Sequence, residues 1–136
     1  DVYKRQIEDA VFGTDLTGAN IIVSGGLGMG SRENFKKLHT LADMLGAAVG
    51  ASRAAVAAGY AGYAHQVGQT GVSVRPDIYI AFGISGAVQH LSGISGAKKI
   101  YAVNHDPKAP IHEYADFSVI ADCTSVLDKL IEKAGG

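Results

Sequence analysis

Residues 78–86 read Ile-Tyr-Ile-Ala-Phe-Gly-Ile-Ser-Gly, an apolar run that leads into a turn of small residues. An uninterrupted apolar run of this length is typical of a strand buried on both faces, as the strands of parallel sheets are. Glycine directly after a strand lets the backbone turn sharply or approach a ligand closely. The stretch therefore predicts a parallel strand whose carboxyl end opens onto a glycine-containing turn.

Similar apolar runs recur along the chain, and helical patterns separate them. We expect strands at 20–24, 47–50, 78–82, 99–104 and 117–121, and helices at 31–45, 52–58, 86–91 and 123–133. The first helix is the clearest, because its apolar residues fall on one stripe and Ser31 precedes them as an N-cap. This alternation predicts an α/β fold: a doubly wound, Rossmann-like parallel sheet of about five strands flanked by helices. Residues 59–77 show little periodicity and predict a long loop with a short helix.

Length and composition limit the possible functions. The 136 residues suit one domain, and we expect residues 16–136 to form it, with residues 1–15 as a linker or fragment edge. Lys and Arg number 12 against 13 Asp and Glu, so there is no basic excess and we expect no nucleic acid as partner. No apolar run reaches the ~18 residues that span a bilayer, so we expect no membrane insertion. The single cysteine and the spacing of the five histidines predict no metal site.

The turns that follow the predicted strands carry the candidate ligand groups. In sheets of this class, ligands bind beyond the carboxyl ends of the strands. The turns here consist largely of small or polar residues: Ser-Gly-Gly-Leu-Gly-Met-Gly at 24–30, Ala-Ser-Arg at 51–53, Gly-Ile-Ser-Gly at 83–86, Asn-His-Asp at 104–106 and Asp122. Turns from a strand into a helix direct backbone N–H groups toward an anion. We therefore expect a nucleotide to bind at this edge.

Three better-known motifs are incomplete. The loop at 24–30 lacks the third glycine position of a dinucleotide fingerprint, and the chain has no P-loop. A tight turn without a ligand remains an alternative for that loop. Ala87 breaks the pattern of a nucleophile elbow around Ser85, so we expect no nucleophilic serine there. Arg53 after the second strand suits a phosphate or an electron-rich ring better than a ribose hydroxyl.

Four motifs in order resemble the electron transfer flavoprotein alpha subunit family. They are Val-Gly-Ala-Ser-Arg-Ala-Ala-Val at 49–56, Val-Gly-Gln-Thr-Gly at 67–71, residues 78–91, and Ile-Tyr-Ala-Val-Asn at 100–104. The resemblance runs from about residue 16 to residue 131 and covers only the C-terminal FAD-binding domain of that subunit. It implies that FAD is the cofactor.

The resemblance also implies which residues bind the cofactor. Arg53, beside Ser52, would lie against the flavin ring, and the hydroxyl of Thr70 would reach its N5 atom. His90 would lie near the pyrimidine carbonyl, donating a hydrogen bond when neutral and adding a charge when protonated. The whole implied set is Arg32, Ser52, Arg53, Val67, Gly68, Gln69, Thr70, Ser85, Gly86, Ala87, Val88, Gln89, His90, Asn104, Asp122 and Cys123.

One residue departs from the family pattern. Leu27 stands where many members have arginine, and Arg32 is the nearby arginine that would have to replace it. The other implied residues suit an electron carrier. Arg53, His90 and a helix N-terminus would stabilise the negative charge of a reduced flavin. No residue is expected to act as an acid or a nucleophile.

The implied function is electron transfer. The resemblance implies that the protein accepts electrons from dehydrogenases, such as acyl-CoA dehydrogenases, and passes them to a quinone reductase or another acceptor. It also implies a beta subunit as partner, and a location in the bacterial cytoplasm or the mitochondrial matrix. Two alternatives remain open: an NADP-binding domain of a transhydrogenase-like enzyme, and a nucleotide-binding module without redox chemistry.

Overall fold

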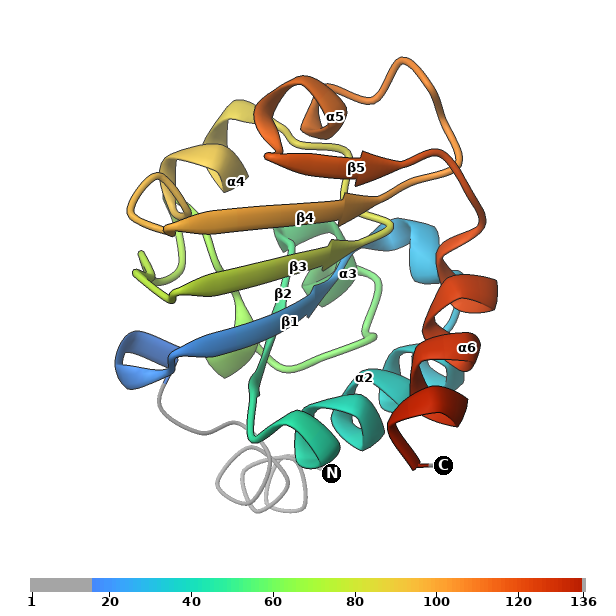
Figure 1. Ribbon diagram of the computed structural model, residues 1–136. Helices are drawn as coiled ribbons and strands as arrows, with labels where there is room; N and C mark the ends of the chain where they lie inside the picture. The colour runs from blue at the N-terminus through green and yellow to red at the C-terminus, as the bar shows by residue number, and fades with distance from the viewer. Residues whose placement is uncertain (1–15, 136) are drawn as a thin grey trace.

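The computed structural model describes residues 16–135, which form one parallel sheet with helices on both faces (Figure 1). The expected linker at 1–15 lies outside the described residues. The strands are β1 (Ile21–Gly25), β2 (Ala48–Ala51), β3 (Ile78–Phe82), β4 (Lys99–Val103) and β5 (Phe117–Val119), in the spatial order β2-β1-β3-β4-β5. The predicted α/β class and the parallel sheet are confirmed.

Strand β3 lies at the centre of the sheet, as its apolar sequence requires. Its residue Ile80 is aligned with Val23 on one side and with Tyr101 on the other. The chain runs from β1 outward to β2 and then returns to the other side of β1 to form β3. The two connections therefore leave β1 in opposite directions, and a crevice forms at such a reversal, beyond the carboxyl ends of β1 and β3.

The helices begin and end within two residues of the predicted positions. They are α2 (Arg32–Leu45), α3 (Arg53–Ala57), α4 (Val88–Ser92) and α6 (Cys123–Gly135), with 3-10 turns η2 (Leu16–Gly18), η3 (Leu27–Met29) and η4 (Tyr63–His65). Ser31 caps α2 as predicted, because its hydroxyl oxygen accepts a hydrogen bond of 3.1 Å from the backbone of Asn34. The short helix α5 (Ile111–Tyr114) was not predicted, since four residues give no periodicity to recognise.

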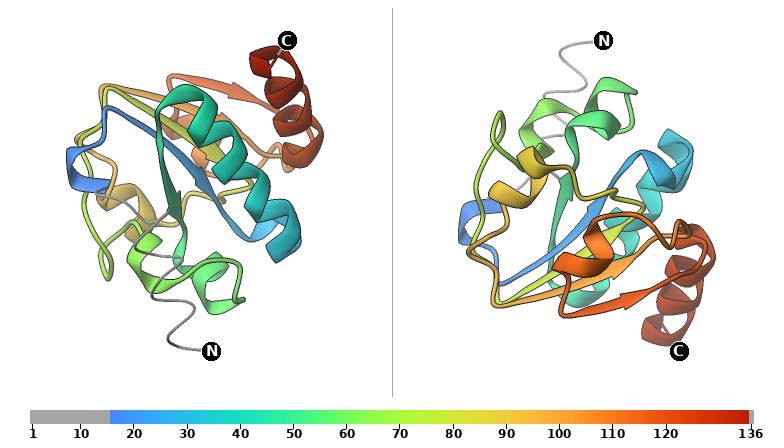
Figure 2. Two further views of the ribbon diagram at one scale, coloured as in Figure 1. Left: turned by 90° about the horizontal axis from the view of Figure 1, so that it is seen from below. Right: turned by 90° about the horizontal axis from the view of Figure 1, so that it is seen from above.

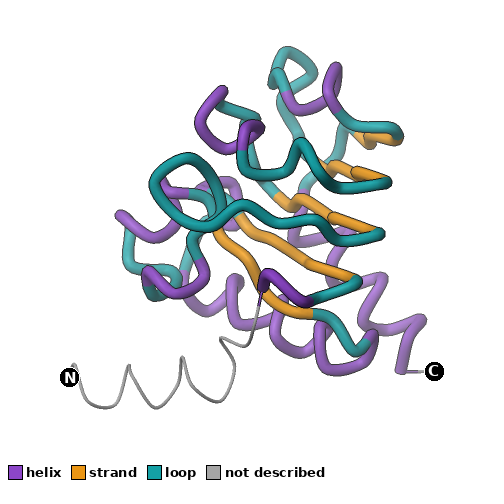
Figure 3. Tube along the Cα trace, turned by 90° about the vertical axis from the view of Figure 1, so that its left-hand side faces the viewer, coloured by secondary structure: helices purple, strands orange, loops and turns teal. Residues whose placement is uncertain are grey.

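Two apolar cores lie on the two faces of the sheet. One contains Phe35, Leu38 and Leu41 of α2 and Leu127 of α6, packed on Val23 and Phe82. The other contains Tyr79, Val67, Ile94 and Ile111, which come from β3, the loop after α3, the segment after α4, and α5. Figure 2 shows α2 and α6 on one side of the strands, and Figure 3 shows the strands between the two layers. Within residues 16–135 no helix is both long enough and apolar enough to cross a bilayer.

Candidate cofactor site

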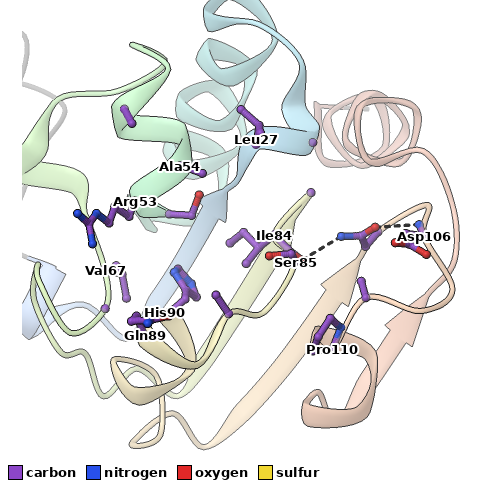
Figure 4. A pocket seen from close by; sticks show the side chains of 18 of the residues that line it. Leu27, Arg53, Ala54, Val67, Ile84, Ser85, Gln89, His90, Asp106 and Pro110 are labelled. Atoms are coloured by element: carbon purple, nitrogen blue, oxygen red, sulfur yellow. Dashed lines mark hydrogen bonds between the residues drawn. The ribbon is translucent and has the colours of Figure 1, made fainter.

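An elongated cavity of about 730 Å³ lies at the carboxyl ends of the strands, where the sequence predicts a ligand. This volume is within the range of small-molecule and cofactor sites. Arg53 and Val67 lie toward one end, Ile84 and Ser85 in the middle, and Asp106 and Pro110 toward the other end (Figure 4). The cavity therefore brings together segments that are more than eighty residues apart in the chain, from Leu27 to Pro110.

The turn from β2 into α3 positions Arg53. Ser52 is buried, and its hydroxyl oxygen accepts a hydrogen bond of 3.2 Å from the backbone of Ala55, while its own backbone N–H donates to Gly25. Arg53 is the first residue of α3 and is exposed at the cavity. Within the described part of the chain its guanidinium has no hydrogen bond or ion pair, so its charge is available to a ligand.

The loop at 66–72 forms the wall beside Arg53. The backbone of Val67 donates to Ala51, and the backbone of Gln69 donates to Gln89 at 2.8 Å, so the loop is fixed to both β2 and α4. Gly68 has a φ of 135°, and a Cβ atom there would lie 2.8 Å from the carbonyl oxygen of Gln89. Only glycine allows this close approach.

Thr70 is held by two neighbours in the same wall. Its hydroxyl oxygen accepts a hydrogen bond of 2.8 Å from Nε2 of Gln66, and its carbonyl oxygen accepts one from the hydroxyl of Tyr63. Because the hydroxyl oxygen is used as an acceptor, its hydrogen can be donated to a ligand in the cavity. This arrangement is compatible with the role that the resemblance implies for Thr70.

His90 provides a buried nitrogen beneath the cavity. The residue is only 5% exposed, and its Nε2 atom lies 2.7 Å from the hydroxyl oxygen of Tyr79. Burial lowers the pKa of His90 to about 4, although the backbone of Val67 acts in the opposite direction. The ring is therefore neutral at pH 7, where it can donate a hydrogen bond, and it adds a charge only in acid. Among the described residues, Nδ1 of His90 is buried and has no hydrogen-bond partner.

The far end of the cavity is built by the segment after β4. Asn104 is buried, its Nδ2 atom donates to the carbonyl oxygen of Ile84 at 3.0 Å, and its Oδ1 atom accepts from the backbone of Asp106 at 2.8 Å. The sequence placed the turn at 104–106 at this edge, although only Asn104 entered the implied cofactor set; the other lining residues Lys108, Ala109 and Pro110 were not predicted. The signal that was available is the Asn-His-Asp run directly after an apolar strand.

Eleven of the sixteen implied residues line the cavity, and five do not: Arg32, Gly86, Val88, Asp122 and Cys123. Leu27 lines the cavity where many family members have arginine, while Arg32 begins α2 outside it. Asp122 accepts hydrogen bonds from Thr124 and Ser125 at the start of α6, and these lower its pKa. The cofactor roles of all sixteen residues remain predictions.

Cys123 packs into the core beside α2. It is buried, and its sulfur lies 3.3 Å from the carbonyl oxygen of Gly28 and 3.7 Å from the sulfur of Met29. Burial, together with the charge of Asp122, raises the pKa of the thiol to about 11. We therefore expect Cys123 to react with iodoacetamide at pH 8 at least tenfold more slowly in the folded chain than in urea, because the thiolate is the reactive form. Equal rates would contradict this placement.

The donor set does not resemble a metal site. Residues 16–135 contain no group of three or more His, Cys, Asp or Glu side chains that could hold a metal ion. The polar groups that line the cavity are instead two cations, hydroxyls, amides, two imidazoles and one carboxylate. These are groups that bind oxygen and nitrogen atoms of an organic ligand.

Comparison with known proteins gives one consistent result. Residues 15–95 match the family model of the electron transfer flavoprotein FAD-binding domain. The chain is 55% identical over 119 residues to the mitochondrial electron transfer flavoprotein subunit alpha of Oryza sativa subsp. indica, covering 88% of this chain and 33% of that protein. It is 50% identical over 132 residues to electron transfer flavoprotein subunit alpha of Bacillus subtilis (strain 168), covering 97% of this chain and 41% of that protein. The chain thus spans well under half the length of these curated relatives.

Proposed function

The chain belongs to the electron transfer flavoprotein alpha subunit family, and from this premise we propose that it binds FAD and acts as an electron carrier. The observation that carries the proposal is the form of the cavity, which has two chemically different ends joined by a turn of small residues. FAD likewise has a ring system at one end and an adenosine at the other, joined by a pyrophosphate chain.

The residues of the cavity fit this ligand. Arg53, Thr70 and His90 lie at the end that would receive the ring, where they offer a free cation, a hydroxyl and a buried nitrogen without a partner. The segment after Asn104 offers carboxylate and ammonium groups at the other end. A bound FAD supplies the redox chemistry, and the chain would contribute orientation and a field that favours added negative charge.

We further propose the partners that this function requires. The named relatives are alpha subunits, which supports a beta subunit as partner of this chain. Dehydrogenases, such as acyl-CoA dehydrogenases, would donate electrons, and a quinone reductase or similar oxidoreductase would accept them. Relatives from a bacterium and from a mitochondrion support either the bacterial cytoplasm or the mitochondrial matrix as the location.

The test is to measure by calorimetry how tightly FAD, FMN and NADPH bind to the chain, both alone and mixed with a beta subunit. We expect FAD to bind at least tenfold more tightly than FMN, because FMN lacks the adenosine half that would reach Asp106 and Pro110. Tighter binding of NADPH than of FAD would favour the transhydrogenase-like alternative instead. If none of these three redox-active ligands bound, the result would favour the nucleotide-binding module without redox chemistry.

Arg53 is expected to favour the reduced flavin. Replacing it with alanine should lower the midpoint potential by about 40 mV for a one-electron couple, which corresponds to about 1 kcal/mol. We expect an effect of this modest size because Arg53 is exposed, so water screens its charge. Redox titration of FAD-loaded Arg53→Ala measures it.

Two further variants control this experiment. Arg53→Lys should recover only part of the potential, because an ammonium group cannot stack on a planar ring. Arg75→Ala removes an exposed arginine that does not line the cavity and should leave the potential unchanged. An equal shift in Arg53→Ala and Arg75→Ala would indicate a general effect of net charge, with no specific role for Arg53.

A further inference from the structure

Tyr79 and His90 form a buried pair beneath the cavity, and Tyr79 belongs to neither the implied cofactor set nor the cavity lining. Tyr79 is the second residue of the central strand β3 and is 0% exposed. Its hydroxyl oxygen is 2.7 Å from Nε2 of His90, and the two ring centroids are 6.0 Å apart with the planes tilted by 52°. A fully buried tyrosine hydroxyl in a sheet needs a hydrogen-bond partner, and His90 is placed to be that partner.

The direction of this hydrogen bond follows from the surroundings of the hydroxyl. Burial raises the pKa of Tyr79 far above its ordinary value, so the phenol keeps its proton. The hydroxyl of Ser24 acts against this rise, as a hydrogen-bond donor to the phenol oxygen does, so Nε2 of His90 is placed to accept the phenol hydrogen. Tyr79 therefore keeps its proton and donates a hydrogen bond to Nε2.

This bond determines which ring nitrogen of His90 carries a hydrogen. A neutral imidazole has one N–H and one lone pair, and here the lone pair must be on Nε2. The hydrogen is then on Nδ1, a buried atom that completes no hydrogen bond among the described residues, although the backbone of Val67 is close enough to raise the pKa of the ring. Because His90 lines the cavity, this N–H is the donor that the ring can offer to an acceptor atom of a bound ligand.

We propose that Tyr79 is a positioning residue, which holds His90 in the Nδ1–H form and so presents a neutral hydrogen-bond donor to a carbonyl oxygen of the ligand. The ligand part of the proposal rests on the proposed function. The tautomer part is a property of the chain alone and can be tested without any ligand.

The first experiment measures the imidazole 15N chemical shifts of the 136-residue chain at pH 7, with His90→Gln used to assign the signals. We expect a protonated Nδ1 and an unprotonated Nε2 for His90 in the wild type. Tyr79→Phe keeps the ring and removes only the hydroxyl, and it should move the signals toward the Nε2–H form. Tyr101→Phe is the matched control, because Tyr101 lies on the adjacent strand with its ring stacked on Phe117, and it should change nothing.

Two results of this experiment would overturn the proposal. One is a wild-type His90 that carries its proton on Nε2, a result that needs no variant to fold. The other is a folded Tyr79→Phe variant whose His90 signals stay unchanged.

The second experiment measures FAD affinity. Tyr79→Phe should bind FAD roughly three- to tenfold more weakly than the wild type and Tyr101→Phe, the range expected for one neutral hydrogen bond. A shifted tautomer with unchanged affinity would overturn the ligand part of the proposal. If the wild type binds no FAD at all, the proposed function fails, and the 15N shifts still decide the role of Tyr79.

Discussion

Replacing Gly83 with alanine is expected to lower the free energy of unfolding by about 3 kcal/mol or more. Gly83 directly follows β3 and has a φ of 68°, a left-handed conformation that costs an L-residue ~1–2 kcal/mol. A Cβ atom there would also lie 2.8 Å from two backbone atoms of Gly28. Backbone atoms cannot move aside as a flexible side chain can, so the turns after β1 and β3 would have to separate. The hydrogen bond of 3.0 Å from the backbone of Gly28 to Gly83 would be lost with them.

Gly46 offers a matched control for this variant. It ends α2 with a φ of 67°, but a Cβ atom there meets nothing within 4 Å. Gly46→Ala should therefore lose only the ~1–2 kcal/mol of backbone strain, and the difference between the two variants isolates the close approach of Gly83 to Gly28. Urea unfolding of both variants measures it. Equal losses would show that the two turns separate at little cost.

The same contact shapes the candidate site. Leu27, Gly28 and Gly83 all line the cavity, so a separation of the two turns changes its middle section. Gly83→Ala should therefore weaken FAD binding even where the variant is fully folded, and Gly46→Ala should not. The measurement is the FAD affinity of each variant at urea concentrations well below its unfolding midpoint.

The fold was predictable because its signals are local. An apolar run gave β3 its correct bounds, and Ser31 followed by an apolar stripe located the start of α2. The order of the strands was not available from the sequence. Nor does the sequence show that the carboxylate of Asp122 accepts hydrogen bonds from Thr124 and Ser125 at the start of α6, outside the cavity.

The site was predictable only to the level of segments. Turns after strands indicated where a ligand binds, but no periodicity shows which way a side chain points within a turn. The Tyr79–His90 pair illustrates this limit, because it joins a strand residue to a helix residue across the turn between them. Burial of that pair also keeps His90 neutral, and the sequence alone does not show whether a histidine is buried.

His90 is expected to make the folded chain sensitive to acid. Its pKa is about 4 in the folded state and ~6.5 when the chain is unfolded, because burial disfavours the charged ring. Between these values the unfolded state binds more protons than the folded state, so stability falls as the pH falls. The contribution is fully present above pH ~6.5, is lost on the way down to pH ~4, and changes no further below that. A difference of this size corresponds to about 3 kcal/mol in total.

Urea unfolding at pH 7.0 and pH 4.5 measures this effect, with His90→Gln as the variant that removes it. We expect the wild type to lose about 2–3 kcal/mol more than His90→Gln between these two pH values. His105→Gln is the control, because it removes an exposed histidine and should keep the wild-type difference. The lowered pKa of Asp122 acts below the ordinary carboxyl value and so lies outside this window. Equal losses in the wild type and in His90→Gln would show that His90 does not cause this sensitivity to acid.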